Sequence, residues 1–178
     1  MSLSIRRIFI TGFMGAGKTT VAASLARMLS CRMIDLDQFI ARREGRTPQQ
    51  IIDEDGEARF RQLETSALRE VLSDDAAVYV VALGGGAWTV EQNRALINEH
   101  DGFTVWLDAP FQLCWQRIRS GGPARPLARD REKARRIYKE RRPIYALATL
   151  HVRATKERSA HDRATEIADT LLHGTAQV

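Results

Sequence analysis

Residues 12–19, with the sequence GFMGAGKT, have the composition and spacing of a loop that binds nucleotide phosphates. Glycines let the backbone bend so that successive amides point at phosphate oxygens, and a following helix adds the partial positive charge of its N-terminus. Lys18 is expected to reach the β- and γ-phosphates, and the hydroxyl of Thr19 to ligate Mg²⁺. The alternative is a glycine turn with a lysine by chance. A predicted strand before the loop and a predicted helix after it favour the phosphate site.

Two carboxylates, Asp35 and Asp37, follow the next predicted strand. Residues two apart in an extended segment point to the same side, and the carboxyl ends of strands in an open α/β sheet line the ligand crevice. One carboxylate could hold Mg²⁺ through water while the other accepts hydrogen bonds from a substrate hydroxyl. The alternative is that Asp37 caps a helix that we expect to begin at Gln38.

Three glycines and several arginines are the remaining candidates for ligand binding. Gly84, Gly85 and Gly86 follow a predicted strand, and the absence of side chains there would let the backbone approach a ligand closely. A flexible turn is the alternative. An arginine binds a carboxylate or phosphate through two parallel hydrogen bonds, although each arginine taken alone would as readily be a solvated surface residue. The arginines considered are Arg61, Arg125, Arg141 and Arg142.

The elements that must position these residues alternate between strand and helix. Strands are predicted at residues 5–10, 32–34, 77–83, 103–107 and 150–152. Helices are predicted at residues 19–29, 38–44, 57–72, 90–99 (opened by Thr89 and Glu91), 110–119, 131–140 and 160–172, with one more that starts at Pro48 after a Thr47 cap. This alternation indicates a parallel sheet with helices on both faces, a three-layer α/β/α arrangement in a single domain over residues 1–178.

The composition restricts the partners and the location. The formal net charge is +5 and the sequence pI is about 9.7, which favours anionic partners such as nucleotides, small acids or nucleic acid. Cys31 and Cys114 belong to no metal-binding or disulfide pattern. No apolar stretch approaches the roughly 20 residues of a membrane span, and the N-terminus does not look like a signal peptide. Of these anionic partners we expect a nucleotide and a small acid, bound by a cytoplasmic monomer with no membrane or nucleic-acid partner.

Taken in order, these motifs resemble those of shikimate kinase over nearly the whole chain. The resemblance is carried by the phosphate loop, Ile34–Asp37, Gly56-Glu57 with Phe60-Arg61 and Glu64, Leu83–Ala87, Arg125-Pro126-Leu127 and Arg141–Tyr145. It implies the fold of the nucleoside-monophosphate kinases, a P-loop NTPase fold with five parallel strands in the order 2-3-1-4-5. It also implies transfer of the γ-phosphoryl group of ATP to the 3-hydroxyl of shikimate.

The resemblance also implies individual roles. Asp37 would bind ring hydroxyls and is the nearest candidate for a base, and Asp35 would support Mg²⁺. Arg61 and Arg141 would grip the carboxylate in an acceptor region that includes residues 36–72, and the pocket would be lined by Gly84, Gly85 and Gly86. Arg119 would stack on adenine, and Arg125 would act from a lid at residues 120–130. The nucleotide-binding set is then Gly12, Gly15, Ala16, Gly17, Lys18, Thr19, Thr20, Arg119 and Arg125.

Two departures from the family pattern and two competing interpretations accompany this expectation. Ile52 stands where the family commonly has an aromatic residue, and residues 156–161 lack a proline that often faces adenine. One alternative is another small-molecule kinase with the same phosphate loop, acting on gluconate or a nucleoside. The other is a protein that binds RNA through the basic residues 131–142 and transfers no phosphoryl group.

Overall fold

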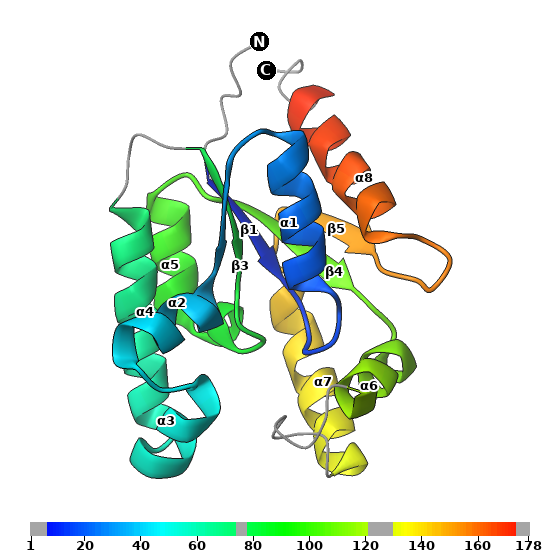
Figure 1. Ribbon diagram of the computed structural model, residues 1–178. Helices are drawn as coiled ribbons and strands as arrows, with labels where there is room; N and C mark the ends of the chain where they lie inside the picture. Colours follow the sequence, from blue (N-terminus) through cyan, green and yellow to red (C-terminus); the bar gives the residue numbers. More distant parts are fainter. Residues whose placement is uncertain (1–6, 74–77, 121–129, 174–178) are drawn as a thin grey trace.

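The computed structural model describes residues 7–73, 78–120 and 130–173. Its five strands are parallel and form one sheet in the order β2-β3-β1-β4-β5, which confirms the expected sheet (Figure 1). The strands are β1 (Arg7–Thr11), β2 (Arg32–Asp35), β3 (Tyr79–Ala82), β4 (Phe103–Asp108) and β5 (Leu150–Arg153).

The central strands are apolar on both sides because helices cover both faces of the sheet. Every residue of β3 is buried, and so are Ile8, Phe9 and Ile10 of β1. A strand buried on two faces has a nearly continuous run of apolar residues instead of an alternating pattern. This is why the sequence between residues 8 and 10, and again between residues 79 and 82, has no polar side chain except the tyrosine hydroxyl.

The helices form a layer on each face of the sheet (Figure 1). Helices α1 (Lys18–Met28) and α8 (Ala160–His173) lie side by side on one face. Helices α4 (Glu57–Leu72), α5 (Glu91–Glu99) and α7 (Arg131–Tyr145) lie on the other. This division follows from right-handed crossovers, because the chain moves to β2 in one direction and then returns to β3, β4 and β5 in the opposite direction. Among the described residues, none of the helices has the length and apolar character needed to cross a membrane.

Three further helices lie in the segments that follow the carboxyl ends of β2 and β4, where the ligand crevice of such a sheet lies. They are α2 (Leu36–Glu44), α3 (Pro48–Asp55) and α6 (Phe111–Ser120). The predicted start of α3 is confirmed: the Thr47 hydroxyl accepts from the Gln50 amide at 3.2 Å, and Pro48 occupies the first turn. The Gln50 side chain in turn accepts from the Thr47 amide at 2.8 Å. The two hydrogen bonds form a capping box, which fixes the start of α3.

The expectation that Thr89 opens α5 was wrong. The structure has a short 3₁₀ helix at Ala87–Thr89, and α5 begins only at Glu91 with Val90 in the cap position. The Thr89 hydroxyl donates to the carbonyl of Gly86 at 2.7 Å, so it closes the turn behind it and does not cap α5. Ser and Thr hydroxyls compete for nearby backbone groups in this way, and the sequence does not show which group they bind.

Helix α7 is longer than predicted, because it runs through Pro143 to Tyr145. A proline inside a helix removes one backbone hydrogen bond and leaves the carbonyl four residues earlier without its donor. Here that carbonyl belongs to Lys139, which is exposed, and Pro143 is in the last turn. Water can therefore satisfy the carbonyl, and the helix continues. Of the predicted loop at residues 120–130, Ser120 ends α6 and Asp130 caps α7, while residues 121–129 lie outside the described part of the chain.

Candidate active site

The loop between β1 and α1 has the backbone geometry that a phosphate site requires. Gly12, Gly15 and Gly17 have φ angles of 138°, 81° and 99°, in the region that favours glycine. A β-carbon on Gly12 would lie 2.8 Å from the carbonyl oxygen of Leu107, and one on Gly15 would lie 2.7 Å from that of Cys114. The loop is therefore held closely between the end of β4 and α6, and glycine is required both for the conformation and for the space.

Lys18 begins α1 and lies over this loop. Its ammonium group donates to the carbonyls of Gly12 at 2.9 Å and Phe13 at 3.1 Å. Burial lowers the pKa of Lys18, and the negative charge of Asp37 partly offsets this effect. A half-buried cation held by neutral carbonyls next to a helix N-terminus is well suited to bind an anion.

The two aspartates are not in one extended segment, which corrects that part of the prediction, but both carboxylates are close enough to Lys18 to interact with its charge. Asp35 ends β2 and is the N-cap of α2, where its Oδ1 accepts from the amide of Gln38 at 3.1 Å. Its Oδ2 accepts from the hydroxyl of Thr19 at 2.8 Å. Asp37 lies in the first turn of α2 and is not the cap. Helix α2 begins two residues earlier than expected because the carboxylate of Asp35 satisfies an amide of its first turn.

Asp37 lies against the glycine segment (Gly84–Gly86) together with the buried Glu64. A β-carbon on Gly84 would lie 2.6 Å from Oδ1 of Asp37 and 3.0 Å from Oε1 of Glu64. Burial raises the pKa of Asp37 above its usual value, and the charge of Lys18 acts in the opposite direction. Glu64 is 0% exposed, and burial also raises its pKa, with a further contribution from the negative charge of Asp37. Gly84 is therefore the position that makes room for two carboxyl groups.

Arg61 lies between Glu64 and Gly86. Its guanidinium pairs with Glu64 at 2.8 Å and Glu57 at 3.1 Å, and it contacts Gly86, on which a β-carbon would lie 2.3 Å from Nη2 of Arg61. Burial acts to lower the pKa of Arg61, but the two glutamates outweigh burial, so the net direction is upward. The guanidinium is thus a permanent cation with a fixed direction.

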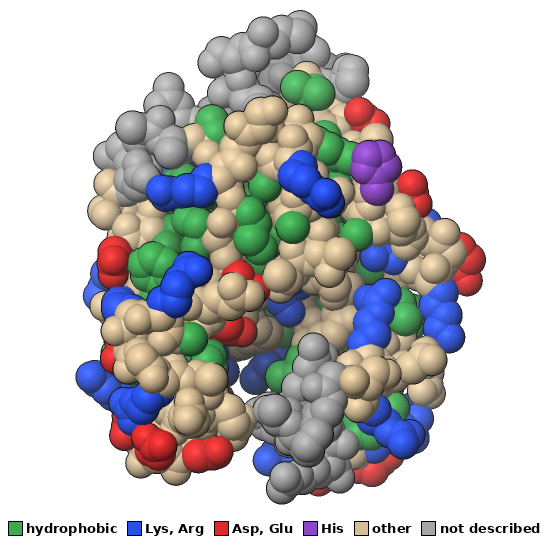
Figure 2. All heavy atoms as spheres, in the orientation of Figure 1, with side chains coloured by type: hydrophobic (Ala, Val, Ile, Leu, Met, Phe, Trp, Pro, Cys, Tyr) green, Lys and Arg blue, Asp and Glu red, His purple; other side chains and the backbone are tan. Residues whose placement is uncertain are grey.

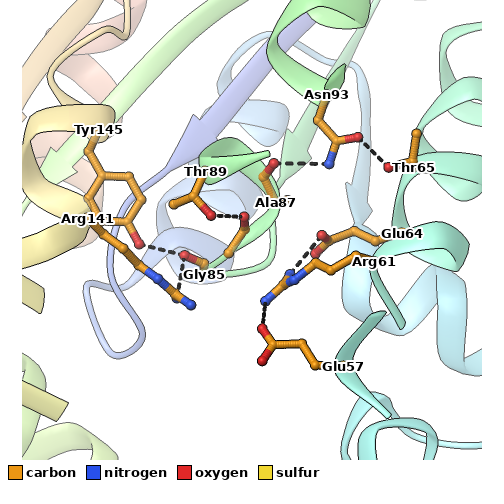
Figure 3. A network of polar contacts seen from close by, with 11 residues as sticks. Glu57, Arg61, Glu64, Thr65, Gly85, Ala87, Thr89, Asn93, Arg141 and Tyr145 are labelled. Carbon is orange, nitrogen blue, oxygen red and sulfur yellow. Dashed lines mark hydrogen bonds and ion pairs between the residues drawn. The ribbon is translucent and has the colours of Figure 1, made fainter. Parts of the chain in front are cut away.

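Arg141 faces Arg61 from the other side of the glycine segment. Its Nη1 donates to the carbonyl of Gly85 at 3.1 Å, and the hydroxyl of Tyr145 donates to the same oxygen at 2.5 Å. Figure 3 shows the guanidinium of Arg141, from α7, and that of Arg61, from α4, pointing toward the same open region beside Gly85. Arg142 is directed elsewhere, because it pairs with Asp108 at 2.8 Å.

The space between these groups is open at the molecular surface. Figure 2 shows a hollow between the part of the protein that contains α2, α3 and α4 and the part that contains α6 and α7, with acidic and basic side chains in its wall. The phosphate loop reaches the same place, because a β-carbon on Gly85 would lie 3.5 Å from the amide nitrogen of Met14. The phosphate loop and the segment Gly84–Gly86 are therefore in contact with each other.

The remaining sequence-predicted residues are more dispersed. Thr20 is exposed in the first turn of α1, and Ala16 is buried within the loop. Arg119 is exposed on α6 and, with Trp115 on the same helix, borders a hollow of about 490 Å³. Arg125 lies outside the described residues. Ile52 is half-buried and packs against the apolar core.

Sequence reasoning assigned no role to two residues that support the site. Glu64 was noted as part of a motif, and its position three residues after Arg61 on a helix was the available signal for an ion pair. Tyr145 holds the carbonyl of Gly85 from a position 60 residues away in the sequence. No local pattern predicts that contact, because it depends on where α7 packs.

A phosphate loop between β1 and α1, a parallel sheet in the order 2-3-1-4-5 and a facing cluster of cations and carboxyl groups define a P-loop kinase. Comparisons with known proteins specify the family. A family model described as shikimate kinase matches residues 14–172.

Relatives and solved structures agree with this match. The shikimate kinase of Nostoc punctiforme is 34% identical over 167 residues, covering 92% of this chain and 90% of the relative. That of Geobacter sulfurreducens is 39% identical over 166 residues, covering 92% and 89%. The structure of shikimate kinase from Acinetobacter baumannii in complex with shikimate superposes with a TM-score of 0.89 at 34% identity, covering 98% of this chain and 97% of the other. The chain belongs to the shikimate kinase family, a family of kinases of aromatic amino acid biosynthesis that phosphorylate shikimate with ATP.

Proposed function

We propose that this chain transfers the γ-phosphoryl group of ATP to the 3-hydroxyl of shikimate in the hollow between the phosphate loop and the glycine segment. The observation that carries this proposal is the contact between the two sites: Gly85 adjoins Met14 of the phosphate loop, while Arg61 and Arg141 reach the same region from opposite sides. An acceptor with a carboxylate and several hydroxyls matches two guanidiniums and the carboxylate of Asp37.

Each residue has a distinct task in this mechanism. Arg61 and Arg141 hold the acceptor's carboxylate, which orients the ring. Asp37 accepts a hydrogen bond from the reacting hydroxyl and is the nearest group to take its proton. Lys18 exchanges its backbone carbonyls for phosphate oxygens and stabilises the negative charge that moves during transfer. Such a reaction depends on positioning and on charge stabilisation more than on covalent help from the protein.

The side chains of Thr19 and Asp35 fit the magnesium ion that such a transfer requires. The described residues hold no cluster of three or more histidine, cysteine or acidic side chains that could enclose a metal. Mg²⁺ in kinases does not need one, since it keeps several waters and binds phosphates plus one or two protein oxygens. The hydroxyl of Thr19 and the carboxylate of Asp35, 2.8 Å apart, supply two such oxygens. When bound there, the ion would neutralise phosphate charge.

For the nucleotide we propose the same binding residues that the sequence predicts. The loop residues Gly12, Gly15, Ala16 and Gly17 and the first turn of α1, including Thr20, surround the phosphates. Arg119 stacks on adenine, and Arg125 approaches the transferred group from a lid at residues 120–130. We propose a single-domain cytoplasmic monomer without a nucleic-acid partner. Its acceptor-binding region includes residues 36–72.

The proposal is tested by measuring ADP release with shikimate, gluconate and a set of nucleosides as acceptors. We expect rapid release with shikimate alone, and NMR of the product should place the phosphate on the 3-hydroxyl. Release with gluconate or a nucleoside but not with shikimate would refute the assignment. A crystal structure with shikimate and ADP should show Asp37, Arg61 and Arg141 around one ligand, and their separation on different surfaces would also refute it.

Arg61→Ala is expected to raise the KM for shikimate roughly 30-fold, because the loss of one partner of a carboxylate–guanidinium pair costs about 2 kcal/mol. The KM for ATP should change little, since Arg61 is directed at the acceptor region. Steady-state kinetics with each substrate varied in turn gives both constants. Arg61→Lys serves as the matched control that keeps the charge opposite the buried Glu64. An unchanged KM for shikimate would falsify the clamp role of Arg61.

Gly86→Ala is also expected to raise the KM for shikimate, because the added methyl group would displace Arg61. Gly86 has φ −110° and ψ −13°, which any residue can adopt, so the backbone is not strained by alanine. The added β-carbon would instead overlap the guanidinium of Arg61, which cannot move without breaking its ion pairs with Glu57 and Glu64. We expect the KM for shikimate to rise roughly tenfold, with unchanged affinity for ADP.

A double variant separates this contact from other effects of the alanine. In the Arg61→Ala background, Gly86→Ala should cause little further loss, because the group with which it collides is absent. Independent, multiplicative effects of the two substitutions on the KM for shikimate would contradict this explanation.

A further inference from the structure

Helix α6 carries two arginines that point to different sides of the helix. Arg117 and Arg119 are two positions apart, and each residue of an α-helix advances about 100°, so their side chains leave on nearly opposite faces. Arg119 is exposed, whereas Arg117 is half-buried and crosses to the phosphate loop. The family resemblance directed attention to Arg119, and sequence reasoning gave Arg117 no role.

Arg117 holds the outer side of the phosphate loop at two adjacent peptide units. Its Nη1 donates to the carbonyl oxygens of Gly15 at 3.1 Å and Ala16 at 3.2 Å. The same nitrogen would lie 3.3 Å from a β-carbon on Gly17. One guanidinium nitrogen thus binds two consecutive loop residues and lies beside a third. It comes from a residue about a hundred positions later in the chain.

This contact determines the direction of the loop amides. In a trans peptide the carbonyl and the N–H of the same unit point in opposite directions. Fixing the carbonyls of Gly15 and Ala16 toward α6 therefore turns the amides of Ala16 and Gly17 away from α6. The amide of Ala16 donates to the carbonyl of Phe13 at 3.1 Å, which closes the turn, and the amide of Gly17 opens α1. The side of the loop opposite Arg117 is where helix α1 presents its N-terminus to phosphates.

A second arginine, Arg163 of α8, places another positive charge nearby. It is 3% exposed and donates to the carbonyls of Thr155 and Arg158, in the segment that follows β5. Burial lowers the pKa of Arg163, and repulsion from Arg117 acts in the same direction.

We propose that Arg117 is a positioning residue of the nucleotide site: it holds the outer carbonyls of the phosphate loop, which turns the amide of Gly17 toward the nucleotide, and it adds positive charge behind the loop. This inference rests on the proposed function only as far as the loop binds a nucleotide. It does not depend on the identity of the acceptor. Its consequence is selective, because nucleotide affinity should depend on Arg117 whereas shikimate affinity should not.

The test is isothermal titration of the intact protein with ADP and, separately, with shikimate. Arg117→Met keeps the length of the side chain but removes both hydrogen bonds and the charge, so we expect the Kd for ADP to rise about tenfold. Arg117→Lys should recover most of this loss, since a single ammonium can donate to two carbonyls. Arg135→Met, at an exposed arginine of α7, is the matched control and should bind ADP as the wild type does.

The outcomes distinguish the inference from the proposed function. Weak ADP binding by Arg117→Met, with shikimate binding within twofold of wild type and recovery by lysine, supports the inference. Wild-type ADP affinity in Arg117→Met, or a lysine variant as weak as the methionine variant, overturns it. An equal loss of ADP and shikimate affinity also overturns it, because a general structural defect would explain both. Failure of the wild-type protein to release ADP with shikimate refutes the proposed function alone.

Discussion

Lys18→Met is expected to lower kcat about a thousandfold and to leave the fold intact. Removal of one donor that stabilises transition-state charge in a dry site costs about a hundred- to thousandfold, and Lys18 contributes a full charge as well as hydrogen bonds. Methionine has a similar length and no charge, so packing is conserved while the interaction with the phosphates is lost. Steady-state ADP release at saturating ATP and shikimate measures the effect.

The stability of this variant provides an independent check. Because burial lowers the pKa of Lys18 below its value in the unfolded chain, the charged form is disfavoured in the folded protein. Removing the ammonium should therefore not lower the midpoint of thermal unfolding at neutral pH. A kcat within tenfold of wild type would contradict the assigned role of Lys18. A large fall in the unfolding temperature would show that the lost activity reflects misfolding.

Asp37→Asn is expected to lower kcat about a hundredfold and to raise thermal stability at neutral pH. The loss of activity follows because asparagine cannot take a proton, and general-base groups typically contribute about a hundredfold or more. The gain in stability follows because burial, and then the negative charge of Asp35, raise the pKa of Asp37 and disfavour its charged form in the folded protein. Function and stability are therefore expected to change in opposite directions at this position.

The pH dependence of both effects has a definite sign. The pKa of Asp37 is raised in the folded protein, so protonation favours folding, and this stabilisation is lost as the pH rises through the folded pKa. The gain in unfolding temperature of Asp37→Asn over wild type should therefore be larger at pH 8 than at pH 5. The wild-type kcat/KM should fall as the pH is lowered through the same pKa, and the variant should lack this acid limb.

Two results would change the role assigned to Asp37. A loss confined to the KM for shikimate, with kcat unchanged, would assign it to holding the acceptor and not to accepting the proton. A lower unfolding temperature for Asp37→Asn at pH 8 would contradict the expected cost of the buried carboxylate. Thermal unfolding and kinetics recorded over the same pH series separate these cases.

Features that depend on neighbouring residues were predictable from the sequence. The phosphate loop follows from glycines and a lysine at fixed spacing between a strand and a helix, and the start of α3 follows from Thr47, Pro48 and Gln50. The sheet order followed from a family resemblance that these motifs carried. In the phosphate loop and at the start of α3 the interactions involve residues a few positions apart, so the chain itself specifies them.

Contacts between distant segments were not predictable in this way. The direction of the Asp35 carboxylate depends on the hydroxyl of Thr19, which donates to it from 16 residues earlier in the chain. The requirement for glycine at position 84 comes from Asp37 and Glu64, on two other elements. Sequence spacing gives no measure of such distances.

The same limit applies to the choice between adjacent arginines. Arg141 contacts Gly85, whereas Arg142 pairs with Asp108, and Arg117 reaches the phosphate loop, whereas Arg119 does not. All four residues are chemically identical, and each pair lies on a single helix. Which side chain reaches the site depends on how α6 and α7 are rotated against the sheet, and the packing of their apolar faces determines that rotation.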